Sequence, residues 1–386
     1  MKKKVAVLGA TGSIGKSTLD ILRNGRDSFE PVLFSAGKNL NALIQLKKEF
    51  PGAITALADE SPSARDNGTK PSGIDFIGRE QLLDAIAAAK ADITVNGIAG
   101  AAGLEPSAAA IKAGSDLALA NKETIVMAGR LIFDLAAEKN VNIIPVDSEH
   151  SAVFKLIHAH GRDNIIDIIL TASGGPFRNY SVEELDRVTP QEALAHPTWN
   201  MGPKITVDSA TLANKGLEVI EAAGLFGFRG ENIKVTIHPQ SIVHSMVRLK
   251  SGAVYAQMSN PDMRLPIHEA LTWPGTEYSP FGVINFDSLN LSFEKCDLEK
   301  FPMLGLAYEA LRGGPLLPTV YNAANEIAVE AFFRGDIGFL EIPRIVGYVI
   351  NQSIKNTERP ISIEAVLDCD KEARKLAEEY IGSLRC

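Results

Sequence analysis

Cysteine is scarce in this sequence: three occur in 386 residues, at Cys296, Cys369 and Cys386, and none belongs to a CxxC pair. This usage excludes a disulfide framework and a thiolate metal cluster, and it fits the reducing cytoplasm. Long apolar runs are also lacking, because segments such as 165–170 are far shorter than the roughly 20 residues that cross a bilayer. The basic start of the chain soon meets glycine, so we predict a first strand there rather than a signal peptide.

Positive charge is not in excess. Lys and Arg number 39 against 47 Asp and Glu, which gives a net charge of −8. This balance does not favour nucleic acid or anionic membrane as a partner, so any phosphate must be held by a local site. The length and the 45% hydrophobic content are sufficient for two or three domains.

Short apolar runs alternate with helical segments over residues 1–147. This order predicts an α/β domain with a Rossmann-like, doubly wound parallel sheet. The predicted strands are 5–8, 31–35, 93–96, 117–120 and 142–146, and the predicted helices are 14–23, 40–49, 81–90 and 123–139. The polar segment 60–73 has no periodicity and is predicted to be an exposed, mobile excursion.

The pattern changes after residue 147. Strands at 165–171, 234–237, 245–249 and 254–258, with a helix at 211–225, predict a second, α+β domain over 148–273. Residues 274–300 are predicted to be a linker. Helical periodicity at 302–312, 323–334, 342–351 and 363–383 predicts a C-terminal helical bundle over 301–386.

A glycine-rich turn follows the first predicted strand. Gly9, Gly12 and Gly15 have GxxGxxG spacing before a predicted helix, so backbone N–H groups can face a pyrophosphate. After the second strand, Gly37 and Lys38 stand where NAD-binding domains usually carry an acid, which favours the 2′-phosphate of NADPH. The alternatives are glycines that serve packing alone and a solvated loop lysine.

Two carboxylates follow the strand predicted at 141–146. If the chain stays extended, Asp147 and Glu149 point to the same side, at the edge of the sheet where ligands bind. Oxygen ligands without thiolate favour Mg²⁺ or Mn²⁺ over zinc. A solvated acidic turn is the alternative.

A helix is predicted to begin at the N-cap Asp208 and to run to residue 225. One face of it carries an amide, an ammonium and a carboxylate, which suit a metal and a phosphate: Asn214, Lys215 and Glu218. Spacing alone allows Glu221 in place of Glu218, and an ordinary surface ion pair is the alternative.

Two loops carry further polar groups. Ser173 with Gly174 and Gly175 offers a hydroxyl and open N–H groups to an anion, although an ordinary turn has the same sequence. The loop 196–204 fits a lid that closes over a substrate, with packing between domains as the alternative. Histidines outside this loop lack metal-site spacing and are interpreted as structural or surface residues: His150, His158, His160, His238 and His244.

Taken together, these motifs resemble the 1-deoxy-D-xylulose 5-phosphate reductoisomerase family, NADPH enzymes of the non-mevalonate isoprenoid pathway. The resemblance covers essentially the whole chain. It rests on GATGSIG at 9–15, ANKE at 120–123, VDSEHS at 146–151, SGG at 173–175, HPTWNMG at 196–202, DSATLANKGLEVIE at 208–221 and PDMR at 261–264. Ala10 stands where the family often has Ser, a change that leaves the backbone turn intact.

The resemblance implies a role for each group of residues. A divalent ion, Mg²⁺ or Mn²⁺ with Co²⁺ as a further option, would be held by Asp147, Glu149 and Glu218. The implied substrate contacts are Lys122, Ser148, Ser173, His196, Ser209, Asn214 and Lys215, with Trp199 as the lid aromatic and Met263 nearby. The implied NADPH contacts are Gly9, Thr11, Gly12, Ser13, Ile14, Gly37, Lys38, Asn39, Asn121, Glu123 and Gly202.

The implied reaction has two stages. The carbon skeleton of 1-deoxy-D-xylulose 5-phosphate rearranges at the metal, and hydride transfer then gives 2-C-methyl-D-erythritol 4-phosphate. A retro-aldol/aldol route and an α-ketol shift need the same ligands, so both stay open, as do the proton-transfer roles of Lys122 and His196. Another NADP-linked dehydrogenase and a non-catalytic NADPH sensor are the alternatives. The family and the exposed edge of the second domain predict a homodimer.

Overall fold

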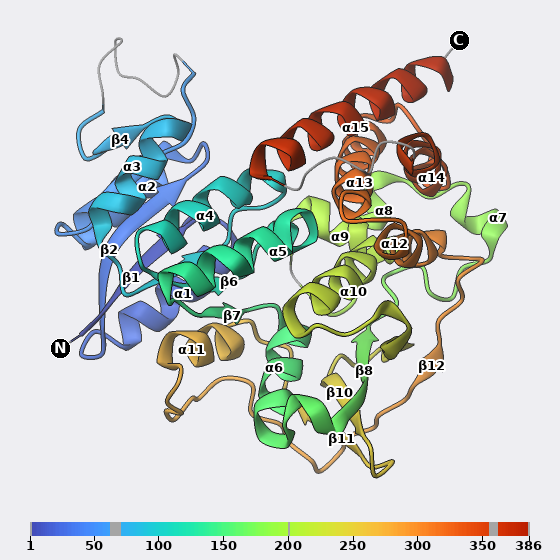
Figure 1. Ribbon diagram of the computed structural model, residues 1–386, viewed down its shortest axis with the longest axis horizontal. Helices are drawn as coiled ribbons and strands as arrows, with labels where there is room; N and C mark the ends of the chain where they lie inside the picture. The colour runs from blue at the N-terminus through green and yellow to red at the C-terminus, as the bar shows by residue number, and fades with distance from the viewer. Residues whose placement is uncertain (1, 62–70, 200, 355–361, 385–386) are drawn as a thin grey trace. The chain divides into compact units, whose positions relative to one another are not determined.

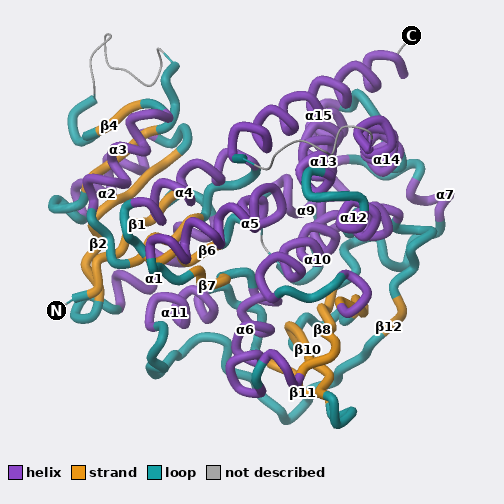
Figure 2. Tube along the Cα trace, viewed as in Figure 1, coloured by secondary structure: helices purple, strands orange, loops and turns teal. Residues whose placement is uncertain are grey.

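The computed structural model describes residues 2–61, 71–199, 201–354 and 362–384 (Figures 1 and 2). Its contacts divide the chain into two compact units. Unit 1 comprises Met1–Thr124, Ile132–Ser151 and Asp262–Gly282, and unit 2 comprises Ile125–Leu131, Ala152–Pro261 and Val283–Cys386. The boundaries predicted at 147, 273 and 300 stay predictions. The predicted excursion at 60–73 falls mostly on residues 62–70, which lie outside the described residues.

Unit 1 is built on a parallel sheet of seven described strands. The strand order is β4-β3-β2-β1-β5-β6-β7, so the connections run to either side of the β1 and β5 pair. The strands are β1 (Lys3–Leu8), β2 (Phe29–Ala36), β3 (Ile54–Leu57), β4 (Phe76–Ile77), β5 (Ile93–Asn96), β6 (Asp116–Leu119) and β7 (Ile143–Pro145). Central strands such as β5 are buried along their whole length, as parallel sheets covered on both faces require. The predicted doubly wound, Rossmann-like sheet is confirmed.

Helices cover both faces of this sheet. Because connections between parallel strands are almost always right-handed, the strand order puts α1 and α2 on one face and α3 and α4 on the other. The helices of unit 1 are α1 (Ser13–Asn24), α2 (Leu40–Glu49), α3 (Arg79–Ala89), α4 (Leu104–Lys112) and α11 (Arg264–Thr272), while α5 (Lys122–Lys139) and α6 (Ser148–His160) contribute residues to both units. The pattern of the sequence does not predict α11, which packs against α1, β6 and β7. Its first residue, Arg264, forms an ion pair with Asp20 of α1 at 2.8 Å.

Unit 2 contains a mixed sheet of five described strands in the order β11-β10-β8-β9-β12. Strands β8 and β9 are parallel, and the other neighbours are antiparallel. The strands are β8 (Ile165–Ala172), β9 (Ile233–Ile237), β10 (Val243–Leu249), β11 (Val254–Met258) and β12 (Glu294–Lys295). Ile168 and Leu170 of β8 share a buried core with Val219 of α10, so this sheet supports the helix that carries the predicted polar face.

The helices of unit 2 surround α13, whose side chains are almost all buried. The helices are α7 (Val182–Leu185), α8 (Pro190–Ala193), α9 (Pro203–Ala210), α10 (Ala213–Phe226), α12 (Pro302–Arg312), α13 (Leu317–Arg334), α14 (Glu341–Ser353) and α15 (Ile363–Leu384). Helices α12, α14 and α15 pack against α13, which confirms the predicted C-terminal bundle (Figure 1). Among the described residues, no helix has both the length and the apolar character needed to cross a bilayer.

The prediction of Asp208 as an N-cap is wrong. Helix α9 begins earlier, at the N-cap Gly202 with Pro203 in its first turn, and Asp208 lies inside it, 1% exposed. Its carboxylate pairs with Lys204 Nζ at 2.9 Å and accepts a hydrogen bond from Asn325 Nδ2 at 2.8 Å. The chain then turns at Leu212, which has a φ of +60°, and starts α10.

Candidate functional site

Two glycines of the glycine-rich turn in unit 1 have no room for a side chain. A Cβ on Gly9, whose φ is +76°, would lie 2.9 Å from Gly97 O, and a Cβ on Gly15 would lie 2.4 Å from the backbone of Ala10. These two glycines let α1 pack closely on the sheet. This is the role that the alternative interpretation, glycines that serve packing alone, gives to them. Gly12 is the N-cap of α1 and supplies no side-chain acceptor, and the first turn of α1 has no acid. The N–H groups there can therefore bind an anion such as a pyrophosphate.

The other residues predicted at the nucleotide site lie in several places. Thr11, Ser13 and Ile14 belong to the turn and the start of α1, and Gly37, Lys38 and Asn39 follow β2. The side chain of Asn39 caps α2 by accepting from Ala42 N at 3.1 Å. The side chain of Asn121 caps α5 and donates to Ile98 O, Gly100 O and Glu123 Oε2, so its amide maintains the fold. Gly202 lies in unit 2, as the N-cap of α9.

The acidic motif does not continue as a strand. Helix α6 begins at Ser148, so Glu149 lies in its first turn and the predicted extended course through 147–149 is wrong. Asp147 Oδ1 accepts from Glu149 N at 3.2 Å, and Asp147 O accepts from Ser151 N at 2.8 Å. An Asp at a helix start satisfies N–H groups that an extended strand would not present, which explains the early turn. Carboxylate oxygens of Asp147 and Glu149 nevertheless lie within 4.8 Å of each other, and Ser148 Oγ donates to Glu149 Oε2 at 2.6 Å.

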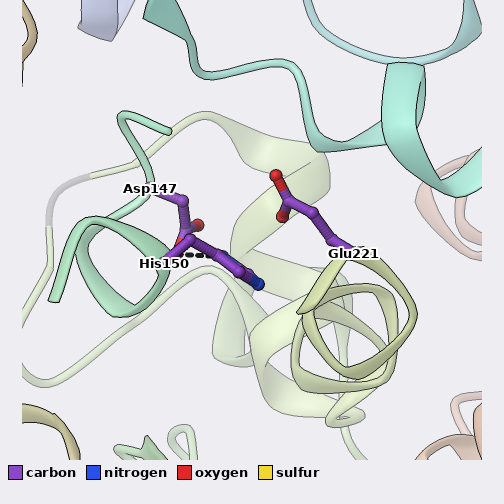
Figure 3. Close-up of side chains that lie close together, drawn as sticks. All are labelled: Asp147, His150 and Glu221. Atoms are coloured by element: carbon purple, nitrogen blue, oxygen red, sulfur yellow. Dashed lines mark hydrogen bonds and ion pairs between the residues drawn. The ribbon is translucent and has the colours of Figure 1, made fainter. Parts of the chain in front are cut away.

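Two basic groups hold the carboxylate of Asp147. Lys122 Nζ lies 2.8 Å from Oδ2. His150 Nδ1 lies 3.1 Å from Oδ1 (Figure 3). Burial by itself raises the pKa of Asp147, but the charge of Lys122 and the contact with His150 outweigh it and hold that pKa well below its ordinary value. Asp147 is therefore ionised and suited to a cation. The interpretation of His150 as merely structural misses this contact, although its spacing of three residues from Asp147 could have indicated it.

Helix α10 carries a buried group of polar side chains. Asn214 Nδ2 donates to Glu218 Oε1, and Lys215 Nζ pairs with Glu218 Oε2. The side chains of Lys215 and Glu218 are only 4% and 1% exposed, so the alternative of a solvated surface pair is wrong. Glu221, labelled in Figure 3, lies one turn later on α10 and is also buried. Desolvation of a buried ion pair can cost more than the pairing gains, so the pair of Lys215 and Glu218 is weak evidence for a purely stabilising role.

Two loop motifs and α9 meet around His196 in unit 2. Its Nε2 lies 3.1 Å from Ser173 Oγ and 3.2 Å from Ser209 Oγ. Its Nδ1 accepts from the N–H groups of Thr198 and Trp199, so the ring proton is on Nε2 and points toward the two hydroxyls. Burial lowers the pKa of His196, which favours this neutral form. The site therefore offers neutral donors to an anion.

The glycines of the Ser-Gly-Gly turn bring it against α9. Gly175 has a φ of +67°, and a Cβ there would lie 2.8 Å from Ser209 O. Ser173 Oγ also accepts from Gly175 N at 3.2 Å. The close approach places the hydroxyl groups of Ser173 and Ser209 beside the imidazole of His196. An ordinary turn would not require such an arrangement.

The remaining predicted residues lie near the ends of helices. Trp199 is half-buried and its ring lies 6.3 Å from that of His244. Asn200 of the predicted lid lies outside the described residues. Met263 precedes α11 in unit 1.

Comparison with known proteins gives the same assignment along the whole chain. A family model described as 1-deoxy-D-xylulose 5-phosphate reductoisomerase matches residues 5–129, and models of the C-terminal domains of this enzyme match residues 143–226 and 258–376. A 1-deoxy-D-xylulose 5-phosphate reductoisomerase from Clostridium botulinum (strain Loch Maree / Type A3) is 46% identical over 385 residues, which cover 98% of both chains. The chain belongs to the 1-deoxy-D-xylulose 5-phosphate reductoisomerase family.

Other members of the reductoisomerase family support this conclusion. The protein of that name from Chlorobaculum tepidum is 46% identical over 98% of this chain and 100% of its own. The solved structure of the reductoisomerase from Zymomonas mobilis in complex with NADPH has a TM-score of 0.89 at 41% identity, over 99% of each chain. A DOX-P reductoisomerase in complex with NADPH, fosmidomycin and magnesium has a TM-score of 0.91 at 36% identity, over 99% of each chain.

Proposed function

We propose that this protein is a cytoplasmic enzyme that converts 1-deoxy-D-xylulose 5-phosphate into 2-C-methyl-D-erythritol 4-phosphate with NADPH and a divalent metal ion. The observation that carries the proposal is the ionised carboxylate of Asp147, held by Lys122 and His150 next to Glu149, in a chain of the reductoisomerase family. A simple hydride-transferring dehydrogenase needs no such acidic motif. The scarcity of cysteine supports the cytoplasmic location.

The donor chemistry fits the metal. Asp147, Glu149 and Glu218 would hold a divalent ion, because three carboxylates without thiolate suit Mg²⁺ or Mn²⁺, and also Co²⁺. Lys122 keeps Asp147 ionised, and Lys215 forms a buried ion pair with Glu218. We assign Glu218 rather than Glu221 on the motif of the family.

The phosphate of the substrate fits the neutral and basic donors of unit 2. Ser173, Ser209 and His196 form one hydrogen-bonded group, and Asn214 and Lys215 lie in the first turn of α10. A helix start with an ammonium group is a favourable place for a phosphate. Lys122 and Ser148 would contact the hydroxyls of the substrate, while Trp199 and Met263 would exclude water around it.

The cofactor fits the glycine-rich turn of unit 1. The N–H groups of α1 would bind the pyrophosphate, and the residues after β2 would bind the adenosine ribose. The residues assigned to NADPH are Gly9, Thr11, Gly12, Ser13, Ile14, Gly37, Lys38, Asn39, Asn121, Glu123 and Gly202.

The reaction follows from these placements. When bound, the metal ion supplies Lewis-acid polarisation of the ketone and NADPH supplies the hydride. Ser173 and Ser209 would hold the phosphate of the substrate, and Lys122 and His150 keep Asp147 ionised for the metal ion. Lys122 Nζ donates to the ionised carboxylate of Asp147 at 2.8 Å, and from this place it would donate hydrogen bonds to the substrate hydroxyls as well.

The proposal predicts NADPH oxidation that depends on both the substrate and the metal. Purified protein with 1-deoxy-D-xylulose 5-phosphate and Mg²⁺ or Mn²⁺ should consume NADPH and form the branched polyol phosphate, identified by mass spectrometry and NMR. Chelation of the metal should abolish turnover, and addition of metal should restore it. Turnover that survives exhaustive chelation would instead indicate a metal-independent dehydrogenase. NADPH binding that neither metal nor sugar phosphate affects would indicate a sensor.

The edge of the sheet in unit 2 supports a homodimer. Strand β11 is an edge strand without charged residues, and Val254 and Tyr255 on it are 50% and 44% exposed. An uncharged edge favours pairing with a second strand. Sedimentation equilibrium should give twice the mass of one chain, and Val254→Lys should shift the protein toward the monomer. Val182→Lys, a matched change at an exposed valine of α7, should leave the dimer intact. A monomeric parent protein would contradict the proposal.

A further inference from the structure

A pocket of about 430 Å³ lies beside the tip of β2 in unit 1. Its walls come from the residues after β2, the residues after β3 and the start of α3. Asp59 N donates to Gly37 O at 2.9 Å, and Gly78 N donates to Leu57 O at 2.8 Å, so backbone hydrogen bonds hold these segments together. The pocket lies at the carboxyl edge of the parallel sheet, where dinucleotide-binding folds hold the adenosine ribose.

Two cations line this pocket. Lys38 and Arg79 are both exposed, and they come from segments 41 residues apart in the sequence, at the ends of β2 and β4. Within the described ranges, neither side chain forms an ion pair with a carboxylate. Both cationic groups can therefore turn toward an anionic ligand.

The carboxylates in the pocket are bound by neutral donors instead. Asp59 accepts hydrogen bonds from Ser61 N at 3.0 Å and from Ser61 Oγ at 2.9 Å. These two bonds lower the pKa of Asp59 most, and the charge of Lys38 lowers it further. Glu60 Oε1 accepts from the backbone N–H of Arg79 at 3.0 Å. This last contact fixes the backbone at the start of α3 and leaves the guanidinium group of Arg79 to project from it.

We infer that Arg79 is a specificity-determining residue, which binds the 2′-phosphate of NADPH together with Lys38. The inference rests on the proposed NADPH-dependent function. A guanidinium group donates two parallel N–H groups to phosphate oxygens, whereas an ammonium group acts as a point charge. NADH has a hydroxyl group in place of this phosphate, so Arg79 contributes to the binding of NADPH alone.

The test compares the two nucleotides in Arg79→Gln and in the parent protein. The change should raise the dissociation constant of NADPH about 10-fold or more, because it removes a charge-assisted hydrogen bond, and should leave that of NADH unchanged. Binding is followed by nucleotide fluorescence, without substrate or metal. In competition binding, the affinity of 2′,5′-ADP should fall by the same factor. The affinity of ADP, which has no 2′-phosphate, should not change.

The control is Arg26→Gln, which removes one positive charge from the same unit at a residue outside the pocket. It should leave both dissociation constants unchanged. Arg79→Lys should retain part of the preference for NADPH. If Arg79→Gln weakens the binding of NADPH and the binding of NADH by the same factor, or if it weakens the binding of neither nucleotide, the inference is overturned while the proposed function stands. If the parent protein itself binds NADH as tightly as NADPH, the proposed cofactor is wrong and the inference fails with it.

Discussion

Glu149→Gln is expected to raise the Mg²⁺ concentration for half-maximal turnover at least 100-fold, and to lower turnover at saturating metal by about three orders of magnitude. A change around a metal ligand commonly costs 10- to 100-fold in affinity, and loss of a ligand should cost at least as much. Three orders of magnitude correspond to about 4 kcal/mol of transition-state stabilisation, within the several kcal/mol that a Lewis-acid metal supplies. Gln keeps the size of Glu149 and removes only its charge.

A readout independent of activity separates metal loss from other damage. Mn²⁺ binding to the variant, followed by electron paramagnetic resonance, should weaken by a similar factor while the melting temperature stays close to that of the parent protein. Glu105→Gln is a control at an equivalent helix position, because Glu105 is an exposed acid in the first turn of α4 and the half-buried Glu149 lies in the first turn of α6. It should leave metal affinity and turnover unchanged. Full turnover of Glu149→Gln at limiting metal would remove Glu149 from the metal site.

Buried apolar runs explain why part of the fold is predictable. The predicted bounds of β5, β11, α2 and α12 are the observed ones, because each is a short run with clear local limits. Helix α13 begins six residues before the predicted start at 323, because Pro318 lies in its first turn, where proline starts a helix rather than ending one. Helix α4 is missed because it is only nine residues long and carries Pro106 near its start. Helix α11 is missed because long-range packing on α1 and the sheet stabilises it.

The candidate site shows the same limits. The motifs locate Asp147, Glu149 and Glu218, but local geometry decides the rest. Asp147 ends the strand by capping α6, which places Glu149 on a helix rather than on an extended segment. Asp208 is an internal residue of α9 because Asn325, 117 residues away, binds its carboxylate. The spacing of residues within one motif cannot predict a contact between residues so far apart in the sequence.

Gly15→Ala is expected to destabilise unit 1 by about 3 kcal/mol and to weaken NADPH binding. Helix propensity alone predicts the opposite, because Ala is about 1 kcal/mol better than Gly inside a helix such as α1. The added Cβ would lie 2.4 Å from Ala10 Cα and Ala10 C and from Gly9 O, and backbone atoms cannot move aside as the end of a side chain can. Overpacking at such a position forces α1 away from β1 and disturbs the N–H groups that we propose bind the pyrophosphate.

Calorimetry and NADPH fluorescence titration measure the two effects. Gly52→Ala is the matched control, because no atom lies within 4 Å of a Cβ at Gly52, which is also in unit 1. That change should alter stability by less than about 0.5 kcal/mol and leave NADPH affinity unchanged. A Gly15→Ala protein that is more stable than its parent would show that propensity outweighs contact at this turn. The close approach of α1 to β1 would then not be what requires glycine at the third position of the GxxGxxG motif.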